Sequence, residues 1–408
     1  MTQRPSDASS SNPYPKVETP KEQIETSSAR SPQRSPQALD PSQADSHLSA
    51  YRYELPEELI AQNPVTPRDS ARLLVVKQQQ HEHCHFRDLS RFLQPNDLLI
   101  LNNTQVIPAR LFGRKRSGGA AEVLLIEPKG VDRWLALVKP GRRLQPGSAV
   151  VFGDPDNPMM LAHIEARDEA TNGRVVRLEP QGQWRDRSIE DLIDQIGKVP
   201  LPPYITESES LPEQYQTVFA QKRGAIAAPT AGLHFTQRLL AELTDKGIQT
   251  AEITLHVGIG TFRPVEATDI KTHKMHEERI EISAATIEKI RRTKAKGGRV
   301  IAVGTTSTRA LEGAAEICGT LQPYTGRTEI FIYPGYRWRV IDGLITNFHL
   351  PESSLLMMVS ALIGRERLMR IYEDAIAQSY RFYSFGDAML ILPEAVLSTT
   401  KFQAAKQL

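Results

Sequence analysis

The sequence predicts an α/β fold that is interrupted by an all-β segment. Beyond Tyr215, apolar runs of strand length alternate with segments of helical spacing, which is the pattern of a sheet covered by helices. Residues 111–199 differ, because short apolar runs follow one another there, separated by Gly and Pro. The first clear helix pattern in this segment is Ile189–Ile196. Such a segment is typical of a small β-barrel or sandwich.

The composition limits the class of protein. The 408 residues correspond to two or three domains at about 150 residues each, and 40% of them are hydrophobic, enough for a sizeable core. With 50 basic and 48 acidic residues, the net charge is only +2, so any nucleic-acid surface must be a local one. Two cysteines exclude a disulfide scaffold and a Cys-rich zinc site. Because no apolar run approaches about 18 residues and no signal core is visible, we expect a cytoplasmic protein without membrane contact.

Composition also divides the chain. Residues 1–50 are rich in Ser, Pro and Gln and cannot bury enough apolar surface to offset the entropy of ordering, so we expect a disordered tail. From Tyr51 the composition becomes globular. The expected division is a tail at 1–50, a first part of the α/β domain at 51–110, a β-barrel domain at 111–199, a second part of the α/β domain at 200–395 and a C-terminal tail at 396–408.

Apolar runs and capping signals define the elements of the α/β part. Arg72–Lys77 and Asp97–Asn102 have strand character, and Phe86–Leu93 between them has helical spacing. Thr236 can cap a helix that runs through Leu243. Further strands are expected at Thr250–Val257, Arg299–Val303, Glu329–Tyr333, Leu344–Phe348 and Ala388–Leu392, and further helices at Ala285–Lys296, Thr308–Ile317 and Arg367–Gln378.

One of these strands has a polar second face. In Thr250–Val257 every other residue is apolar, whereas Glu252, Thr254 and His256 share the opposite face. A parallel strand covered by helices on both sides should be apolar throughout. We therefore expect this polar face to line a site or a barrel lumen. The alternative is an edge strand with one face in water.

Four clusters of polar and small residues lie at strand ends or helix starts, where α/β domains hold their ligands. Small residues let backbone N–H groups approach a ligand, and hydroxyl groups can bind carboxylate, phosphate or ribose oxygens. The cluster that contains Thr305 to Arg309 lacks the lysine that a nucleoside triphosphate loop requires. The candidates in chain order are Thr230, Gly232 and His234; His256, Gly258, Gly260, Thr261 and Arg263, continuing to His276 and Glu277; Thr305, Thr306, Ser307 and Arg309; and Asn347 with His349.

Two histidine-rich segments invite a metal assignment. His273 and His276 with Glu277 have a spacing that could bind a metal, but such a histidine pair more often lies on the surface without one. The run His81–His85 looks like a metal tract, yet it follows three glutamines in what we interpret as a solvated hairpin turn. We therefore expect no metal site.

Longer motifs resemble one family. The runs YELPEELIAQ, PRDSARLLVV, APTAGLHFT, HVGIGTFRPV, HKMHEE, GTTSTRALE, TNFHLP and YRFYSFGDAMLIL follow in this order from about Tyr51 to Leu392. Together they resemble the S-adenosylmethionine:tRNA ribosyltransferase-isomerases of queuosine biosynthesis. The resemblance implies an α/β barrel-like catalytic domain with a small all-β barrel domain inserted near its N-terminal part.

The implied reaction moves and isomerises the ribosyl group of S-adenosylmethionine onto the 7-aminomethyl-7-deazaguanine of tRNA at the wobble position. It gives epoxyqueuosine and releases adenine and methionine. The attacking amine, with a pKa near 10 as in Lys, must lose a proton, and adenine leaves more easily when protonated. His suits either role near pH 7. The candidates for acid and base are His234, His256, Glu277, His349 and Asp387, with the individual roles open; S-adenosylmethionine is a substrate, and no bound cofactor is expected.

Two segments mix arginine with aromatic residues that can stack on unpaired tRNA bases. They are Phe331–Val340 and Tyr380–Phe385, and a solvated charged face is the alternative for each. A monomer is expected. Two other classes remain open: an S-adenosylmethionine-dependent RNA methyltransferase, and a tRNA-binding protein without activity, which leaves the strand-end clusters unexplained. The candidates for RNA contact are Arg337, Trp338, Arg381 and Phe382.

Overall fold

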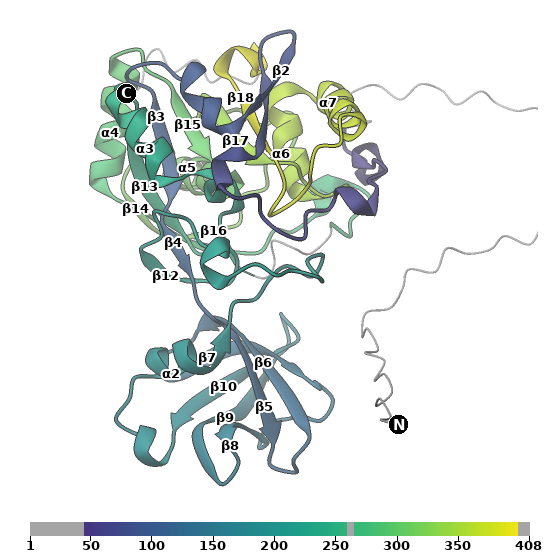
Figure 1. Ribbon diagram of the computed structural model, residues 1–408, viewed down its shortest axis with the longest axis vertical. Coiled ribbons are helices and arrows are strands. Elements are labelled where there is room, and N and C mark those ends of the chain that lie inside the picture. Colours follow the sequence, from purple (N-terminus) through teal and green to yellow (C-terminus); the bar gives the residue numbers. More distant parts are fainter. Residues whose placement is uncertain (1–44, 259–264, 399–408) are drawn as a thin grey trace, which may run out of the picture. The chain divides into compact units, whose positions relative to one another are not determined.

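The structure, a computed structural model, describes residues 45–258 and 265–398. Its strands form a nine-stranded sheet, a seven-stranded sheet and a two-stranded pair of β4 (Thr104–Val106) and β12 (Lys222–Ala225) (Figure 1). Most of the expected N-terminal tail and nearly all of the C-terminal tail lie outside the described residues, as do Gly260, Thr261 and Arg263. None of the described helices is long and apolar enough to cross a membrane.

The nine-stranded sheet is the centre of the α/β part. β13 runs parallel to β3, β3 to β15 and β15 to β17, whereas antiparallel strands extend the sheet on both sides. The order is β16 (Tyr324–Thr328), β14 (Glu278–Ile282), β13 (Gln249–Leu255), β3 (Leu98–Asn102), β15 (Val300–Val303), β17 (Gly343–Asn347), β18 (Ala388–Ile391), β1 (Arg72–Val76) and β2 (His81–His85).

This sheet confirms the α/β class but not the barrel-like closure. Among the described strands, β16 and β2 are two edges that do not pair with each other. The polar face of β13 was expected to line a site or a barrel lumen. Instead, Glu252 and Thr254 on this face form hydrogen bonds with Asn103, which follows β3. Asn103 Nδ2 donates to Glu252 Oε2 over 2.9 Å, and Thr254 Oγ1 donates to Asn103 Oδ1 over 2.8 Å. β13 is also no edge strand, because β14 and β3 flank it.

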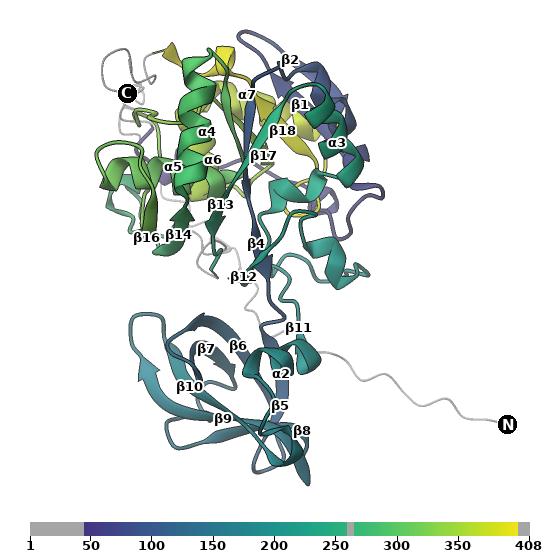
Figure 2. The same ribbon diagram turned by 90° about the vertical axis from the view of Figure 1, so that its left-hand side faces the viewer.

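Helices cover both faces of the sheet (Figure 2). On one face, Leu98 and Ile100 share a core with residues of α4, α5, α6 and α7. On the other, Leu99 and Leu101 pack with residues of α3. β3, β15 and β17 are therefore buried throughout, as expected for parallel strands between helices. The helices are α3 (Gln237–Asp245), α4 (Ala284–Ala295), α5 (Thr305–Ile317), α6 (Ser354–Ile363) and α7 (Arg365–Ala377).

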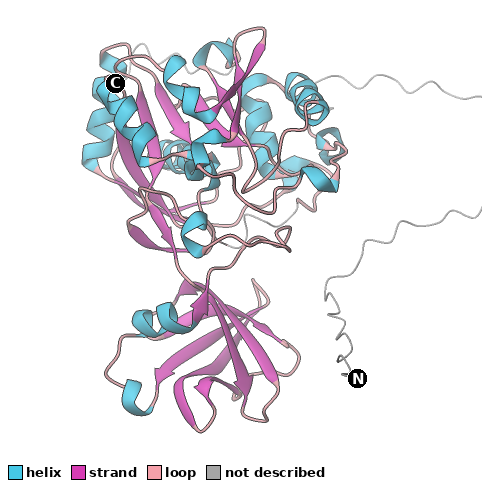
Figure 3. Ribbon diagram, in the orientation of Figure 1, coloured by secondary structure: helices cyan, strands magenta, loops and turns pink. Residues whose placement is uncertain are grey.

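The inserted segment forms a closed barrel, as expected (Figure 3). Its sheet has the order β11-β5-β6-β7-β10-β9-β8, and an additional pairing of β5 with β8 closes it. Helix α2 (Ile189–Ile196) has its predicted bounds, with Ser188 Oγ accepting from Asp191 N over 3.0 Å. The strands are β5 (Arg110–Lys115), β6 (Ala120–Pro128), β7 (Arg133–Lys139), β8 (Ala149–Asp154), β9 (Asn157–Asp168), β10 (Gly173–Pro180) and β11 (Gly197–Lys198).

Three local predictions were wrong. Glu329–Tyr333 is not a strand. Ile330 N donates to Thr328 Oγ1 over 3.3 Å, and Ile330 O accepts from Arg309. The backbone of Ile330 thus bonds to side chains and not to a neighbouring strand. His81–His85 is strand β2 and not a turn, because the hairpin closes earlier, where Lys77 N donates to Gln80 O.

The expected tail also ends earlier than residue 50. Leu48–Tyr51 is a short 3-10 helix, and Tyr51 is fully buried. Asp45 accepts hydrogen bonds from Tyr51 Oη at 2.8 Å and from Arg365 Nε at 2.6 Å. Residues 45–50 are therefore held by the folded part of the chain.

Candidate functional site at the ends of the parallel strands

A cavity lies where the parallel strands end. β13, β3, β15 and β17 point the same way, so their carboxyl ends meet at one edge of the sheet, where α/β proteins bind ligands. None of the described residues that line the cavity is Lys, Arg, Asp or Glu. They are Tyr204, Ala228, Pro229, Thr230, Ala231, Val257, Gly304, Thr305, Thr306, Thr346, Asn347, Phe348, His349, Leu350, Ser353, Leu355, Tyr383 and Ser384. Five of them were predicted as site residues: Thr230, Thr305, Thr306, Asn347 and His349.

The N-terminus of helix α5 forms one wall of the cavity. Gly304 precedes the helix with φ of 91°, a conformation that favours glycine, and Thr305 and Thr306 are the first helical residues. Asn102, at the end of β3, donates from Nδ2 to Thr306 Oγ1 over 3.2 Å and so holds this turn. Free N–H groups and the helix dipole at such a turn attract negatively charged groups. This wall can therefore bind a carboxylate.

His349 contributes a neutral imidazole to the cavity. Its Nε2 lies 2.7 Å from Thr346 Oγ1, and its backbone N donates to Tyr372 Oη over 2.9 Å. Tyr53 Oη donates to its backbone oxygen. Burial lowers the pKa of His349 to about 3, because a charged ring would lose its hydration. The ring is therefore neutral at pH 7 and can donate or accept a hydrogen bond.

His234 lies behind the cavity rather than in its lining. It is fully buried and stacks on Phe86, with ring centroids 5.0 Å apart. Asn347 Nδ2 contacts His234 Nε2 at 3.4 Å and also donates to Tyr383 O over 2.9 Å. Burial, and then the nearby Arg68 and Arg381, hold the pKa of His234 well below 6.5. The ring thus supports Asn347, whose buried Oδ1 has no hydrogen-bond partner among the described residues.

His256 is close to the strand end but does not line the cavity. Its neighbour Val257 does, and successive residues of an extended chain point to opposite sides. His256 Nδ1 lies 2.8 Å from Thr104 Oγ1, and a Cβ on Gly224 would come within 2.8 Å of the ring. Partial burial, followed by the charge of Arg279, lowers its pKa.

Asp387 has a positioning role. Its carboxylate is 2% exposed and accepts from Arg72 N at 2.9 Å, Arg72 Nε at 3.4 Å and Arg381 N at 2.8 Å. These bonds join the start of β1 to the segment before β18, which carries the cavity residues Tyr383 and Ser384. The oxygens of Asp387 thus accept from three donors within the protein, and its acid–base role stays a prediction.

Several other predicted ligand contacts are structural contacts. A Cβ on Gly232 would lie 2.8 Å from Phe219 Cζ, so this glycine permits packing. Ser307 Oγ donates to Val303 O over 2.8 Å inside the core. Arg309 is buried and forms an ion pair with Glu278. No atom of the described residues would come within 4 Å of a Cβ at Gly258.

His276 and Glu277 also lie away from the cavity. They line a different hollow, together with Arg309 and Arg327. Glu277 is exposed and forms an ion pair with Arg327 at 3.3 Å. The acid–base role expected of Glu277 therefore has no support from the geometry.

Two of the four predicted RNA contacts are buried. Trp338 is 3% exposed and donates from Nε1 to Ala361 O over 3.3 Å. Phe382 is fully buried among aromatic rings, so neither ring can stack on a base. Arg381 is bound to the oxygens of Asn63 and Phe385 at 3.2 and 3.0 Å. Arg337 is exposed and lines a hollow with Phe331 and Tyr333.

The sequence reasoning missed most of the apolar and aromatic lining. The rings of Tyr204 and Tyr383 are in contact, with centroids 4.8 Å apart and planes inclined at 56°, and Tyr204 Oη is 2.7 Å from Ser384 Oγ. Tyr383 and Ser384 stand in the motif YRFYSF, which was assigned to RNA contact. Tyr204 follows two prolines in a segment with no functional signal.

The fold and the cavity define a class of protein: an α/β protein with a cavity at its strand ends, whose described lining is uncharged and partly aromatic. Comparison with known proteins identifies the family. The queuosine biosynthesis protein family matches residues 48–391, and the chain belongs to it.

Named relatives agree. The S-adenosylmethionine:tRNA ribosyltransferase-isomerase of Acaryochloris marina is 62% identical over 357 residues, which is 87% of this chain and 96% of that protein. The protein of the same name from Synechococcus elongatus is 59% identical over 88% of this chain and 99% of its own length. The crystal structure of S-adenosylmethionine tRNA ribosyltransferase from Thermotoga maritima is 38% identical, covering 84% of this chain and 100% of that chain, with a TM-score of 0.49.

Proposed function

We propose that this protein transfers and isomerises the ribosyl group of S-adenosylmethionine onto the 7-aminomethyl-7-deazaguanine of tRNA, releasing adenine and methionine. The observation that carries the proposal is the match over nearly the whole length of relatives that bear the name of this activity. The cavity at the strand ends supports it, because its chemistry suits a sulfonium nucleoside. S-adenosylmethionine is then a substrate, and no resident cofactor is invoked.

The carboxylate, the adenine, the sulfonium and an amino group of S-adenosylmethionine each have a complementary group in the cavity. The methionine carboxylate fits the N-terminus of α5 at Thr305 and Thr306, where free N–H groups favour an anion. The rings of Tyr204 and Tyr383 can stack on adenine, and aromatic faces also attract the positive sulfonium. The unpartnered Asn347 Oδ1 can accept from an amino group of the ligand. Among the described residues, the lining holds no fixed cation that would repel the sulfonium.

We propose His349 as the histidine that contacts the reacting ligand. It is the one member of the five nominated acid–base residues that lines the cavity. A ring with a pKa of about 3 holds a proton only briefly, so its role is to orient the ligand by hydrogen bonds and to relay a proton. His234 positions Asn347, and His256 remains a candidate base for the incoming amine from outside the cavity wall.

The tRNA surface we propose centres on Arg337. Phe331 and Tyr333 lie beside it with ring centroids 5.2 Å apart, available to unpaired bases. Phosphate contacts from such a surface should make affinity fall with salt. We also propose that the protein acts as a cytoplasmic monomer and that the chain divides into domains near residues 110 and 199.

The test is adenine release by the full-length protein given S-adenosylmethionine and tRNA that carries the aminomethyl base. We expect free adenine that depends on both substrates. S-adenosylhomocysteine instead would indicate a methyltransferase, and neither product would indicate a binding protein. His349→Gln should lower turnover by about 10²–10³-fold, the usual cost of one preorganised hydrogen-bonding group, while His85→Gln at an exposed strand position serves as the matched control.

Asn347→Leu tests the ligand pose. It removes the unpartnered oxygen, together with the amide donor to Tyr383 O, while keeping a side chain of similar volume. The KM for S-adenosylmethionine should rise by about tenfold, the value of roughly one hydrogen bond. An unchanged KM would show that the amide does not contact the ligand.

A further inference from the structure

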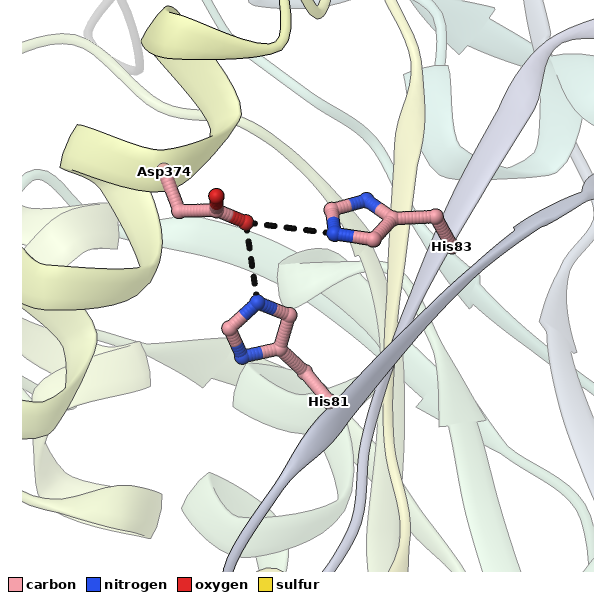
Figure 4. A group of neighbouring side chains, drawn as sticks. All are labelled: His81, His83 and Asp374. Carbon is pink, nitrogen blue, oxygen red and sulfur yellow. Dashed lines mark hydrogen bonds and ion pairs between the residues drawn. The ribbon is translucent and has the colours of Figure 1, made fainter.

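Two histidines and an aspartate converge outside the cavity (Figure 4). His81 Nε2 lies 2.9 Å from Asp374 Oδ2, and His83 Nε2 lies 3.2 Å from the same oxygen. Within the part of the chain that the structure describes, this is the group of His, Cys, Asp and Glu side chains whose ligand atoms all lie within 4.8 Å of one another. The three side chains are partly exposed, so that an ion from solution can reach them.

The fold, and not the local sequence, assembles this group. His81 and His83 stand two residues apart on strand β2, so both side chains leave the same face of the sheet edge. Cys84 points to the other face and is buried in the core. Asp374 comes from helix α7, 293 residues beyond His81. The cluster therefore joins the edge strand to a helix that is remote in the chain.

A buried tyrosine orients one of the histidines. His83 Nδ1 lies 2.8 Å from Tyr380 Oη, and Tyr380 is 1% exposed. The guanidinium of Arg72 covers the Tyr380 ring at 4.0 Å. A partner on the second ring nitrogen, which fixes the direction of Nε2, is the usual support of a metal-binding histidine.

We propose that His81, His83 and Asp374 bind one divalent transition-metal ion of the Zn²⁺ class. The ligands are the two Nε2 atoms and Asp374 Oδ2, with water completing the shell. Two imidazoles and a carboxylate are a donor set that suits Zn²⁺. In a tetrahedral site with bonds of about 2.0–2.1 Å, neighbouring donor atoms lie about 3.3 Å apart. The separations of 2.9 and 3.2 Å need only a small opening to admit the ion.

Such an ion would cross-link strand β2 to helix α7. It would take the place of the two N–H contacts to Asp374 and connect the sheet edge to α7. The proton of each neutral imidazole then lies on Nδ1, where that of His83 can be donated to Tyr380 Oη. The contact of His83 with Tyr380 connects this metal site to the segment that carries Tyr383 and Ser384. The site is separate from the cavity and does not depend on the proposed reaction.

The experiment uses untagged, full-length protein freed of metal by a chelator and then titrated with Zn²⁺ alone in a calorimeter. We expect one ion per chain and a melting temperature that rises with Zn²⁺ concentration, since an ion that binds the folded state stabilises it. Loss of an outer partner alone typically weakens metal binding by about 10–100-fold. His81→Gln, His83→Gln and Asp374→Asn should therefore each weaken binding by at least about tenfold, and Tyr380→Phe by about tenfold.

Matched controls are His85→Gln on the same strand and Cys318→Ser, which should both bind Zn²⁺ like the parent protein. Absence of stoichiometric binding in the parent protein would show that the group is only a histidine–carboxylate ion pair. Parent-like affinity in the His81 or Asp374 variants, or loss of binding in Cys318→Ser, would place the ion elsewhere and overturn the proposal.

Discussion

Replacing His349 by Gln should remove an acid-sensitive part of the protein's stability. Burial lowers the pKa of His349 from 6.5 to about 3 in the folded protein, whereas the unfolded chain keeps the ordinary value. Between these two pH values the His349 side chain is protonated in the unfolded state and unprotonated in the folded state. Stability therefore falls as the pH falls through this window, and it is unaffected above it.

The magnitude follows from linkage. Near pH 5 the solution lies about 1.5 units below the pKa of the unfolded ring, and each unit corresponds to about 1.36 kcal/mol. His349 should thus lower the free energy of unfolding by roughly 2 kcal/mol near pH 5 relative to pH 7.5, and by roughly 3.4 kcal/mol near pH 4.

The assay is urea unfolding of the parent protein, His349→Gln and the exposed control His85→Gln near pH 7.5 and near pH 5. Groups common to all three cancel in the comparison. His349→Gln should lose about 2 kcal/mol less than the parent protein on acidification, and His85→Gln should not share this protection. Equal losses in the parent protein and His349→Gln would refute the argument that burial keeps this ring neutral.

Three further outcomes follow from the structure. His234→Ala should lower the free energy of unfolding by about 2–4 kcal/mol, because the fully buried ring that stacks on Phe86 leaves a cavity; an unchanged urea midpoint would contradict this. Glu312→Ala should cost about 3 kcal/mol or more in the same assay, since its carboxylate accepts the backbone N–H groups of 339–341, and a loss below 1 kcal/mol would count against it. Arg337→Ala should weaken tRNA binding and reduce the slope of log affinity against log salt by about 1, and a parent-like slope would remove Arg337 from the interface.

Local chemistry in the chain was enough to locate most elements. Thr236 was expected to cap a helix, and its Oγ1 accepts from Leu239 N at the start of α3. The bounds of Ile189–Ile196 were predicted because Ser188 and an apolar stripe mark them. Signals of this kind act over three or four residues, so a single sequence contains them in full. The clusters at Thr305 and Asn347 were found for a related reason: polar residues that directly follow a buried strand are visible in the local pattern.

Long-range pairing decided the rest. Asn347 and His234 are 113 residues apart, and only the strand order places one as cavity lining and the other behind it. Trp338 and Phe382 were predicted as RNA contacts because each is an aromatic residue beside an arginine. The local sequence does not show whether such an aromatic ring faces water or the core. Whether the sheet is open depends on whether its two edge strands pair with each other. The contact of His81 with Asp374 depends on which helix packs beside strand β2. Apolar periodicity in a sequence predicts that one face of an element is buried, but it does not show which element packs on that face. The function of a side chain depends on which residues surround it in the folded protein.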